Sequence, residues 1–288
     1  MPRPALMLKT IIFRCENVIL NDEYLRLKSY EKLWHYLRQD PAWSDFDAVL
    51  KLREYYVSEQ RTTSAHSVIA TLHLSATNRL RFEQDIQLFL KKQSRFYLRP
   101  LPGMLPIVRN LKFYYQIVLI AQPGSLYQEA ERKYRFNQLF HFTFLQEKAA
   151  DVQLFQNFLQ NIVRKTRSSE KETLLVSDQL QPDLIAAEKS GINTLQISFD
   201  PRTRGFQPQN YLEWKYFYSL DRIHKQKRTN LPGRNKMNLQ ANTPSEVSGI
   251  ISNLERGGAG EPSKPSGNVS FWDLAKEVFN TPSPLEEK

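Results

Sequence analysis

The sequence contains a single cysteine, Cys15, among its 288 residues. One cysteine can form neither an intrachain disulfide nor a cysteine-based zinc site, and such sparing use is typical of a reducing compartment. Long apolar runs are also missing, because none approaches the roughly 20 residues that a membrane-spanning helix needs. The first 13 residues, MPRPALMLKTIIF, are broken by Lys9 and are not typical of a signal peptide. We therefore expect a cytoplasmic protein that is not transmembrane.

Positive charge is abundant, with a net charge of +10 at pH 7 and an isoelectric point of about 9.5. Between residues 202 and 236 there are nine Lys or Arg against two acids. Residues 222–236, with Lys225, Lys227 and Arg228, could contact an anionic surface, or they could form a solvated arm. No helix-turn-helix, RNA-binding sheet motif or zinc finger accompanies them, so we expect no sequence-specific nucleic-acid binding.

The order of sequence patterns predicts an α/β fold with a helical insertion. Residues 8–13 read as a buried strand. Residues 22–98 place apolar side chains at three- and four-residue spacing, which predicts a bundle of helices. From residue 101 onward, short apolar strands alternate with amphipathic helices, which is typical of a parallel sheet covered by helices on both faces. The fold class predicted is a Rossmann-like α/β core with an inserted α-helical bundle and a partly disordered basic C-terminal tail.

The C-terminal third loses this regularity. Residues 206–239 form an aromatic and basic extension, of which 211–220 could be a last strand or a helix docked on the core. Residues 240–268 are rich in Asn, Ser, Gly and Pro and predict a flexible linker. Residues 269–288 regain apolar character and predict an amphipathic segment that docks on a protein partner or folds back onto its own core. The anchor candidates in this segment are Phe271, Trp272, Leu274 and Phe279.

Five strings resemble the motifs of the haloacid dehalogenase-like (HAD) hydrolases that carry an inserted helical cap. They are LKTIIFRCENVIL (8–20), RPLPGMLPIVRNLK (99–112), IVLIAQPGS (117–125), EKAADVQLFQNFL (147–159) and LLVSDQLQPDLIAAEKSGINTLQI (174–197). The resemblance covers about residues 6–200. It implies a core made of residues 1–21 and 99–205 and a cap made of residues 22–98.

The resemblance also implies a role for particular positions, and several are degenerate. In the family an Asp nucleophile forms an aspartyl-phosphate, a second Asp acts as general acid/base, and their companions hold Mg²⁺. The matching positions here are Arg14 for the nucleophile, Glu16 for the acid/base, Ala121 for the phosphate-binding hydroxyl, Lys148 for the Lys, Asp178 for the metal-ligand Asp and Asp183 for the second acidic position. Of these, Lys148, Asp178 and Asp183 keep the residue type of the family.

The degenerate positions argue against the family's phosphotransfer. The guanidinium of Arg14 is always charged and is not a nucleophile, and it cannot coordinate Mg²⁺, which takes oxygen ligands. Ala121 removes a phosphate-binding donor. We therefore expect no intact catalytic site and no cofactor. Mg²⁺ would enter only if the chain were still a phosphatase, with Asp178 and Asp183 as its ligands.

A cation in place of a carboxylate suggests a structural role for Arg14. Glu16, Asp178 and Asp183 would bring three negative charges into one pocket, and clustered buried charges are costly unless they are neutralised. We hypothesise that the Arg14 guanidinium occupies the vacated metal position and bridges to Asp178. In the simpler alternatives Arg14 points to solvent, and the two Asp residues are a helix cap and a surface acid.

Three functions remain open on the sequence alone. The first is a catalytically inactive HAD-like protein that serves as a protein-binding, assembly or regulatory module through its cap and C-terminal tail. The second is a Mg²⁺-dependent phosphatase or phosphotransferase with non-standard residues, which could use Glu16 as its base. The third is a polyanion-binding protein that uses the basic arm.

Overall fold

The computed structural model describes residues 7–58, 65–146, 151–229 and 239–255. At its centre is a six-stranded sheet in the order β5-β4-β1-β6-β7-β8, with every neighbouring pair parallel. The strands are β1 (Thr10–Arg14), β4 (Gln116–Ala121), β5 (Phe142–Leu145), β6 (Thr173–Ser177), β7 (Asn193–Ile197) and β8 (Leu239–Ala241). Such a sheet must be covered on both faces, and the predicted Rossmann-like α/β class is confirmed.

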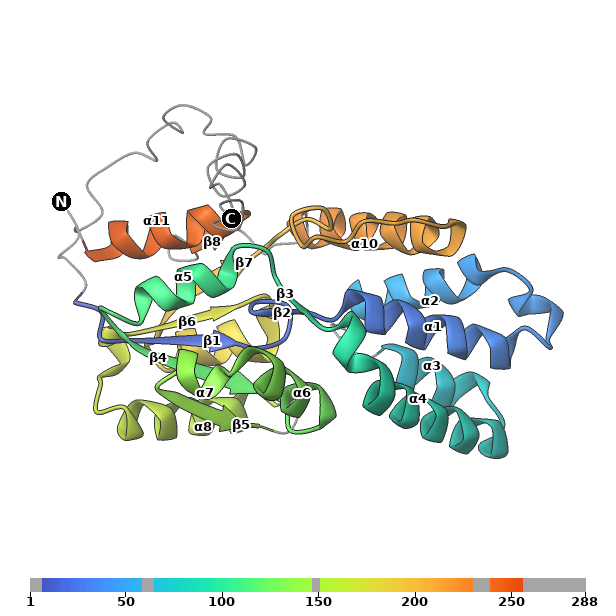
Figure 1. Cartoon of the computed structure of the whole chain (residues 1–288), viewed down its shortest axis with the longest axis horizontal. Coiled ribbons are helices and arrows are strands. Elements are labelled where there is room, and N and C mark those ends of the chain that lie inside the picture. The colour runs from blue at the N-terminus through green and yellow to red at the C-terminus, as the bar shows by residue number, and fades with distance from the viewer. Residues whose placement is uncertain (1–6, 59–64, 147–150, 230–238, 256–288) are drawn as a thin grey trace, which may run out of the picture.

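Alternate side chains of β1 enter the two hydrophobic layers that flank the sheet. Ile11 and Phe13 pack on one side and Ile12 on the other, as the period of two of a strand requires. The first side is covered by α5 (Met104–Leu111), α6 (Ser125–Tyr134), α7 (Phe136–Leu139) and α11 (Pro244–Glu255). The second side is covered by α8 (Val152–Lys165) and α9 (Ile185–Lys189), which follows a short helical segment, Leu180–Leu184. Figure 1 shows α5 and α11 above the sheet and α8 below it.

Four helices lie between the first strand and the rest of the sheet, at one end of the elongated molecule (Figure 1). They leave and rejoin the core through β2 (Leu20–Asn21) and β3 (Arg99–Pro100), which pair antiparallel. We call these helices the helical block: α1 (Glu23–Leu37), α2 (Phe46–Ser58), α3 (Ala65–His73) and α4 (Ala76–Tyr97). A short turn of helix, Pro41–Trp43, joins α1 to α2. No helix within the described ranges has the length and apolar character needed to cross a membrane.

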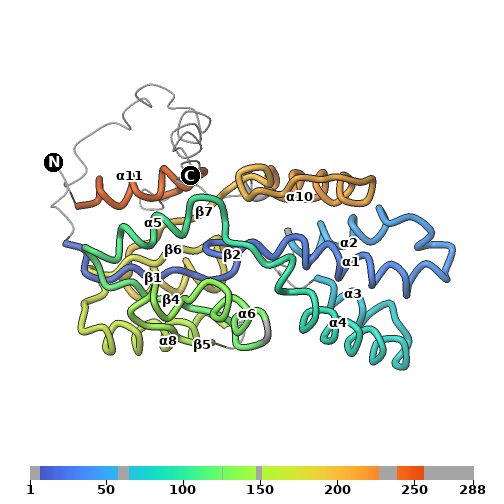
Figure 2. The backbone as a smooth tube through the Cα atoms, in the orientation of Figure 1, coloured from blue at the N-terminus to red at the C-terminus, as the bar shows by residue number. Residues whose placement is uncertain are grey.

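The aromatic stretch 211–220 lies within a helix, α10 (Tyr211–Thr229), which packs against the helical block rather than against the α/β core. Tyr216, Phe217 and Leu220 are buried in the hydrophobic cluster of the block. The tube in Figure 2 runs from the core out to α10, beside α1 and α2. The expectation of a strand is wrong, because the apolar side chains recur at helical spacing. The expectation of docking on the core is also wrong, because α10 packs against α2 of the helical block.

The prediction of a flexible linker over residues 240–268 is wrong for the N-terminal part of that range. β8 adds a parallel sixth strand beside β7, and α11 buries Val247 and Ile251 against the core. The polar residues that suggested a linker instead begin the helix. The Glu246 carboxylate accepts a hydrogen bond from the Asn242 backbone N–H at 2.8 Å, and Thr243 Oγ1 accepts one from the Glu246 backbone N–H at 3.4 Å, so both side chains bind backbone N–H groups at the start of α11. The rest of the expected linker, 256–268, lies outside the described residues, as does 269–288.

Candidate functional site

Three neighbouring strands bring the degenerate motif residues to one edge of the sheet. Arg14 ends β1, Ala121 ends β4, and Asp178 follows β6. Because β4 and β6 pair with β1 on either side, these positions are adjacent in space. The carboxyl ends of parallel strands are where open α/β sheets bind ligands. Ala121 is fully buried there and offers no hydroxyl.

The Arg14 guanidinium is buried among polar and aromatic partners, and the residue is only 3% exposed. Its Nε lies 3.4 Å from Glu16 Oε2 and 3.7 Å from Asp183 Oδ2. Its Nη1 donates to Gln146 Oε1 at 3.4 Å. The guanidinium carbon lies 5.9 Å from the centre of the Phe155 ring, at the outer limit of a cation–π contact. Arg14 therefore acts as the cation of this pocket through ion pairs that are too long to be strong hydrogen bonds.

The pairing differs from the expected bridge to Asp178. The carboxylates that pair with Arg14 are Glu16 and Asp183. Asp178 is 8% exposed, and its buried Oδ1 has no hydrogen-bond partner among the described residues. The simpler alternatives also fail, because Arg14 does not point to solvent and Asp183, 0% exposed, is not a surface acid.

Burial outweighs charge pairing in its effect on the pKa of the two carboxylates that pair with Arg14. Burial raises the pKa of Asp183 to about 6, although Arg14 and a 2.7 Å hydrogen bond from Ser177 Oγ oppose that rise. Burial also raises the pKa of Glu16, against the opposing effects of Arg14 and of the Gln122 amide, which donates to Glu16 Oε1 at 2.9 Å. A single guanidinium thus offsets only part of the cost of burying these carboxylates.

The pocket in this arrangement does not fit Mg²⁺. Carboxylates are suitable ligands, but the Arg14 guanidinium lies between Glu16 and Asp183, and Asp183 is also bonded to Ser177. Across the described part of the chain, no group of three or more His, Cys, Asp or Glu residues is arranged to hold a metal ion. The Glu16 and Asp183 carboxylates are arranged around the Arg14 guanidinium.

The remaining predicted site residues fall outside the described residues or in α10. Lys148 and the four aromatic and aliphatic anchors of the tail, Phe271, Trp272, Leu274 and Phe279, lie outside the described residues. Lys225, Lys227 and Arg228 belong to α10, so the basic stretch begins as a helix and not as an arm.

The sequence analysis did not predict three side chains that contact Arg14 or Asp183. We call Arg14 and the side chains around it the Arg14 pocket. Gln146 follows β5, whose carboxyl end lies at the same edge of the sheet, and this position was a usable signal. Ser177 replaces the Gly of the family motif, and its hydroxyl binds Asp183. Phe155 lies on α8, within the motif-like string 147–159, which was the usable signal for it.

A second buried charge cluster joins the helical block to the core and to α10. Glu23 is the first residue of α1. Its Oε2 lies 3.9 Å from Nη2 of Arg53 on α2, and its Oε1 lies 3.5 Å from Nη1 of Arg204, a residue that follows β7. Glu23 also accepts a hydrogen bond from the Tyr216 hydroxyl of α10 at 2.9 Å. Burial alone would raise the pKa of Glu23, but the nearby arginines and the Tyr216 hydroxyl hold it below its usual value.

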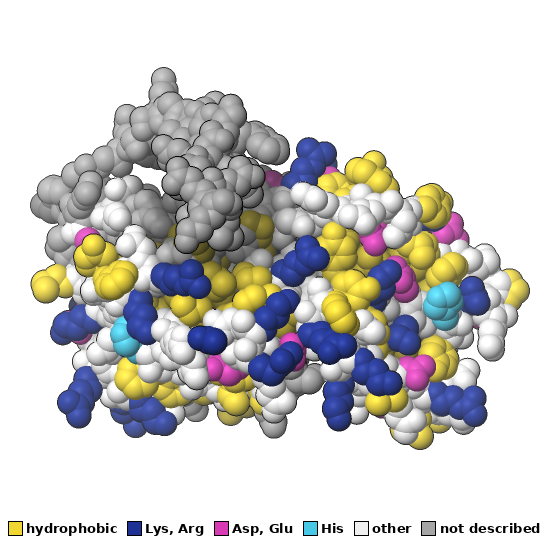
Figure 3. Space-filling model, viewed as in Figure 1, with side chains coloured by type: hydrophobic (Ala, Val, Ile, Leu, Met, Phe, Trp, Pro, Cys, Tyr) yellow, Lys and Arg dark blue, Asp and Glu magenta, His cyan; other side chains and the backbone are white. Residues whose placement is uncertain are grey.

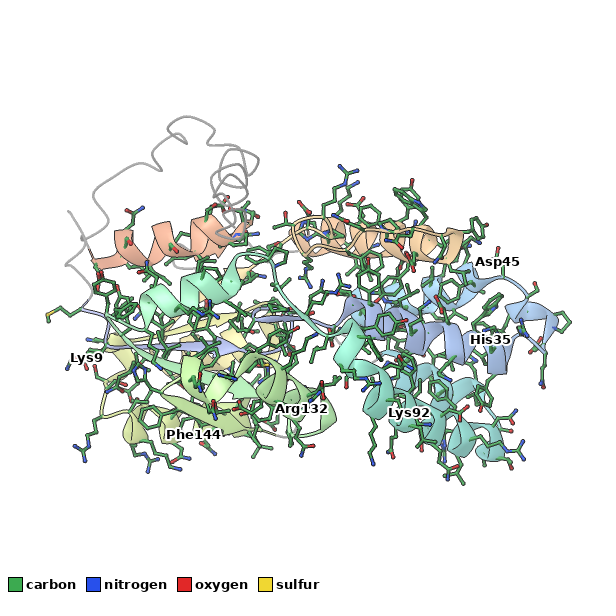
Figure 4. The ribbon with its side chains drawn as sticks, viewed as in Figure 1. Lys9, His35, Asp45, Lys92, Arg132 and Phe144 are labelled. Carbon is green, nitrogen blue, oxygen red and sulfur yellow. The ribbon has the colours of Figure 1, made fainter. Side chains whose placement is uncertain are left out.

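A basic groove runs along the junction of α4 and α6, with a volume of about 540 Å³. In Figure 4, Lys92 projects from α4 and Arg132 from α6, on facing sides of this junction. The acidic member, Glu129, is already bonded to Arg132 at 2.7 Å. The groove is lined by Lys91, Lys92, Gln93, Arg95, Phe96, Glu129 and Arg132.

Comparison with known proteins places the fold. No protein-family model matches the sequence, and no curated protein matches it. Among solved structures, a HAD-like family hydrolase from Xanthomonas campestris aligns with a TM-score of 0.56 and 13% identity, over 87% of this chain and 97% of that one. A β-phosphoglucomutase from Thermotoga maritima gives 0.55 and 13%, over 85% and 99%. The HAD hydrolase YfnB from Bacillus subtilis, in a magnesium-bound form, gives 0.54 and 14%, over 85% and 98%.

These similarities define the class of fold to which the chain belongs. All three neighbours are named as HAD-type hydrolases or a related mutase, and each is matched over nearly its whole length. The chain therefore has the HAD-like α/β fold, as the resemblance of its motifs implies.

Proposed function

We propose that this protein is a catalytically inactive HAD-like protein that works as a protein-binding, assembly or regulatory module. The observation that carries the proposal is Arg14, buried at the position where the family places its nucleophile. An aspartyl-phosphate cannot form there, because a guanidinium has no lone pair available for attack and remains charged at physiological pH. Ala121, at the end of the next strand, supplies no phosphate-binding hydroxyl.

The buried Glu23 cluster supports the same proposal. The B. subtilis neighbour is described as revealing interdomain movement. In this chain, Glu23 contacts Arg53 of the helical block, Arg204 of the core and Tyr216 of α10. Moving the helical block away from the core would break the ion pair between Glu23 and Arg204. A helical block held in this way suits a fixed binding surface better than a cap that opens for substrate.

The alternative is a Mg²⁺-dependent phosphatase or phosphotransferase, since the structural neighbours include a magnesium-bound HAD hydrolase, a protein named as a β-phosphoglucomutase and a HAD phosphatase. In that case Glu16 would act as the base. Its pairing with Arg14 and its hydrogen bond from the Gln122 amide favour the charged carboxylate but also hold it in place. Mg²⁺ and a phosphate ester would be required only under this alternative.

A phosphatase screen tests the choice. We expect no Mg²⁺-dependent turnover of phosphate esters by the wild-type protein, and no difference between it and an Asp178→Ala variant. Turnover that needs Mg²⁺ and disappears in Asp178→Ala would establish the enzyme alternative. Affinity purification with and without residues 269–288 then tests the binding role, since a specific partner should be lost with that segment.

The basic groove favours a second binding function, contact with a polyanion. Lys91, Lys92 and Arg95 line it and make no ion pair with an acid of the described ranges, and the exposed Phe96 lies beside them. Arg95 stacks 4.5 Å from the centre of the Phe96 ring. A cationic groove with an exposed aromatic ring is suited to phosphate-rich chains. We therefore propose α4 and α6, rather than residues 222–236, as the candidate polyanion surface.

A further inference from the structure

The outer face of α10 carries a row of exposed aromatic side chains. Tyr211 is 71% exposed, Trp214 43% and Tyr218 54%. They are three and four residues apart, and the same spacing continues to Arg222 and Lys225. We call these five residues the α10 seam. The upper edge of the molecule, where α10 lies, shows hydrophobic side chains beside Lys and Arg (Figure 3).

Arg222 of the seam pairs with Glu54 of α2, whereas the three aromatic side chains of the seam stay largely exposed. The opposite face, with Tyr216, Phe217 and Leu220, already holds the helix against the helical block. The rings of Trp214 and Tyr218 lie 5.8 Å apart, and each ring also lies close to that of Phe217. Contiguous exposed aromatics mark interaction surfaces, and Trp and Tyr are the side chains most enriched among binding hot spots.

We propose that the α10 seam binds residues 269–288 of the same chain, so that a partner must displace this segment from α10. The inference rests on the proposed role of residues 269–288 as a binding segment. The seam repeats at intervals of three and four residues, which is the spacing that lets one helix pack along another. Phe271, Ala275 and Val278 have the same spacing in the segment.

Charge complements this apolar match. α10 contains five Lys or Arg and two acids, a net charge of +3, whereas residues 269–288 contain four acids and two lysines, a net charge of −2. Arg222 and Lys225 already pair with Glu54 and Asp221, so the expected contribution is one of orientation more than of strength. The aromatic rings are expected to supply most of the affinity.

The tether sets how far residues 269–288 can reach from α11. Residues 256–268 are 13 in number and rich in Gly, Ser and Pro. A flexible chain of that length has a root-mean-square span of about 20 Å and a maximum reach of about 43 Å. Glu255, where α11 ends, lies toward the amino ends of the strands and away from α10 (Figure 1), so the gain in local concentration depends on the tether spanning that separation.

Photo-crosslinking of the full chain tests the proposal. Phe279 is replaced by p-benzoylphenylalanine, the protein is irradiated at low concentration, and crosslinked peptides are mapped by mass spectrometry. We expect monomeric crosslinks from position 279 to residues 211–225. A Trp214→Ser/Tyr218→Ser variant should lose them. A Phe113→Ser/Tyr114→Ser variant is the control and should keep them, because it removes two exposed aromatics near the opposite edge of the sheet.

Three outcomes would overturn the proposal. Crosslinks to surfaces other than α10 would mean that the segment binds at another site. Crosslinks that survive in the Trp214→Ser/Tyr218→Ser variant would mean that the seam is not the binding surface. Crosslinks that join two chains would mean that the segment binds a second copy of the protein. The result is independent of the partner test. If the segment crosslinks to α10 and no partner is captured, the proposed function fails while the contact stands.

Discussion

At the scale of single residues, the Arg14 pocket shows how a substitution of charge reorganises a site. Glu16, Asp178 and Asp183 remain acidic, and Arg14 supplies a cation from inside the pocket. The residue types and their convergence at one edge of the sheet could be read from the sequence, because parallel strands bring their carboxyl ends together. The choice of Asp183 over Asp178 could not, since it depends on side-chain directions at the Leu180–Leu184 turn.

The raised pKa of Asp183 predicts a pH-dependent stability. The folded protein holds this proton with a pKa of about 6, whereas an unfolded Asp has a pKa near 3.9. The contribution of Asp183 to the free energy of unfolding is therefore most favourable below about pH 4 and is lost as the pH rises through 6.

An Asp183→Asn variant, which cannot titrate, isolates this effect. We expect its stability relative to wild type to improve by on the order of 2 kcal/mol between pH 4 and pH 7.5. Urea unfolding of both proteins across this range measures the difference. A difference that does not change with pH would contradict the burial-driven shift.

At the scale of helices and strands, the sequence predicts the elements correctly where apolar periodicity is strong. It fails where the residues that begin a helix are types that also form loops. The strands around β1 and the helices of the helical block follow apolar spacing. The helix α11 is not predicted from the sequence, because Asn242, Thr243 and Pro244 are residue types common in loops that here begin a helix. The placement of α10 on the helical block could not be predicted, since amphipathicity identifies a buried face and not its partner.

The Glu23 cluster predicts a strong stability effect at the junction of α1, α2 and α10. Glu23→Gln leaves Arg53 and Arg204 without their buried counter-charge, so we expect a loss of about 3 kcal/mol in the free energy of unfolding. Chemical denaturation measures the loss. Glu129→Gln, which breaks the exposed pair with Arg132, is the matched control and should change stability little. Equal effects of the two variants would contradict a junction held by buried charge.

At the scale of the whole molecule, the net charge of +10 is not confined to the C-terminal basic stretch. The face in Figure 3 shows Lys and Arg spread over both the core and the helical block. The groove between α4 and α6 gathers cations from segments about 40 residues apart, Lys91 to Arg95 and Arg132. Counting charge along the sequence could not find it, because only the fold brings these residues together.

Polyanion binding by this groove has a measurable signature. For Lys91→Glu/Lys92→Glu, we expect weaker binding to a labelled heparin oligosaccharide and a slope of log K against log salt that is shallower by about 1 to 2. Arg164→Glu/Lys165→Glu is the control, because it changes the same charge on α8, on the other face of the sheet. Equal weakening by both variants would indicate non-specific attraction to the net charge rather than use of the groove.

The most direct test of the central claim, that the Arg14 guanidinium takes the place of a metal ion, is isothermal titration with Mg²⁺. We expect no binding at micromolar strength by wild type or by Arg14→Lys, which keeps the positive charge. Arg14→Asp removes the cation and adds a fourth carboxylate, so it should acquire Mg²⁺ affinity while circular dichroism shows the fold retained. Micromolar binding of Mg²⁺ by the wild-type protein would contradict the claim.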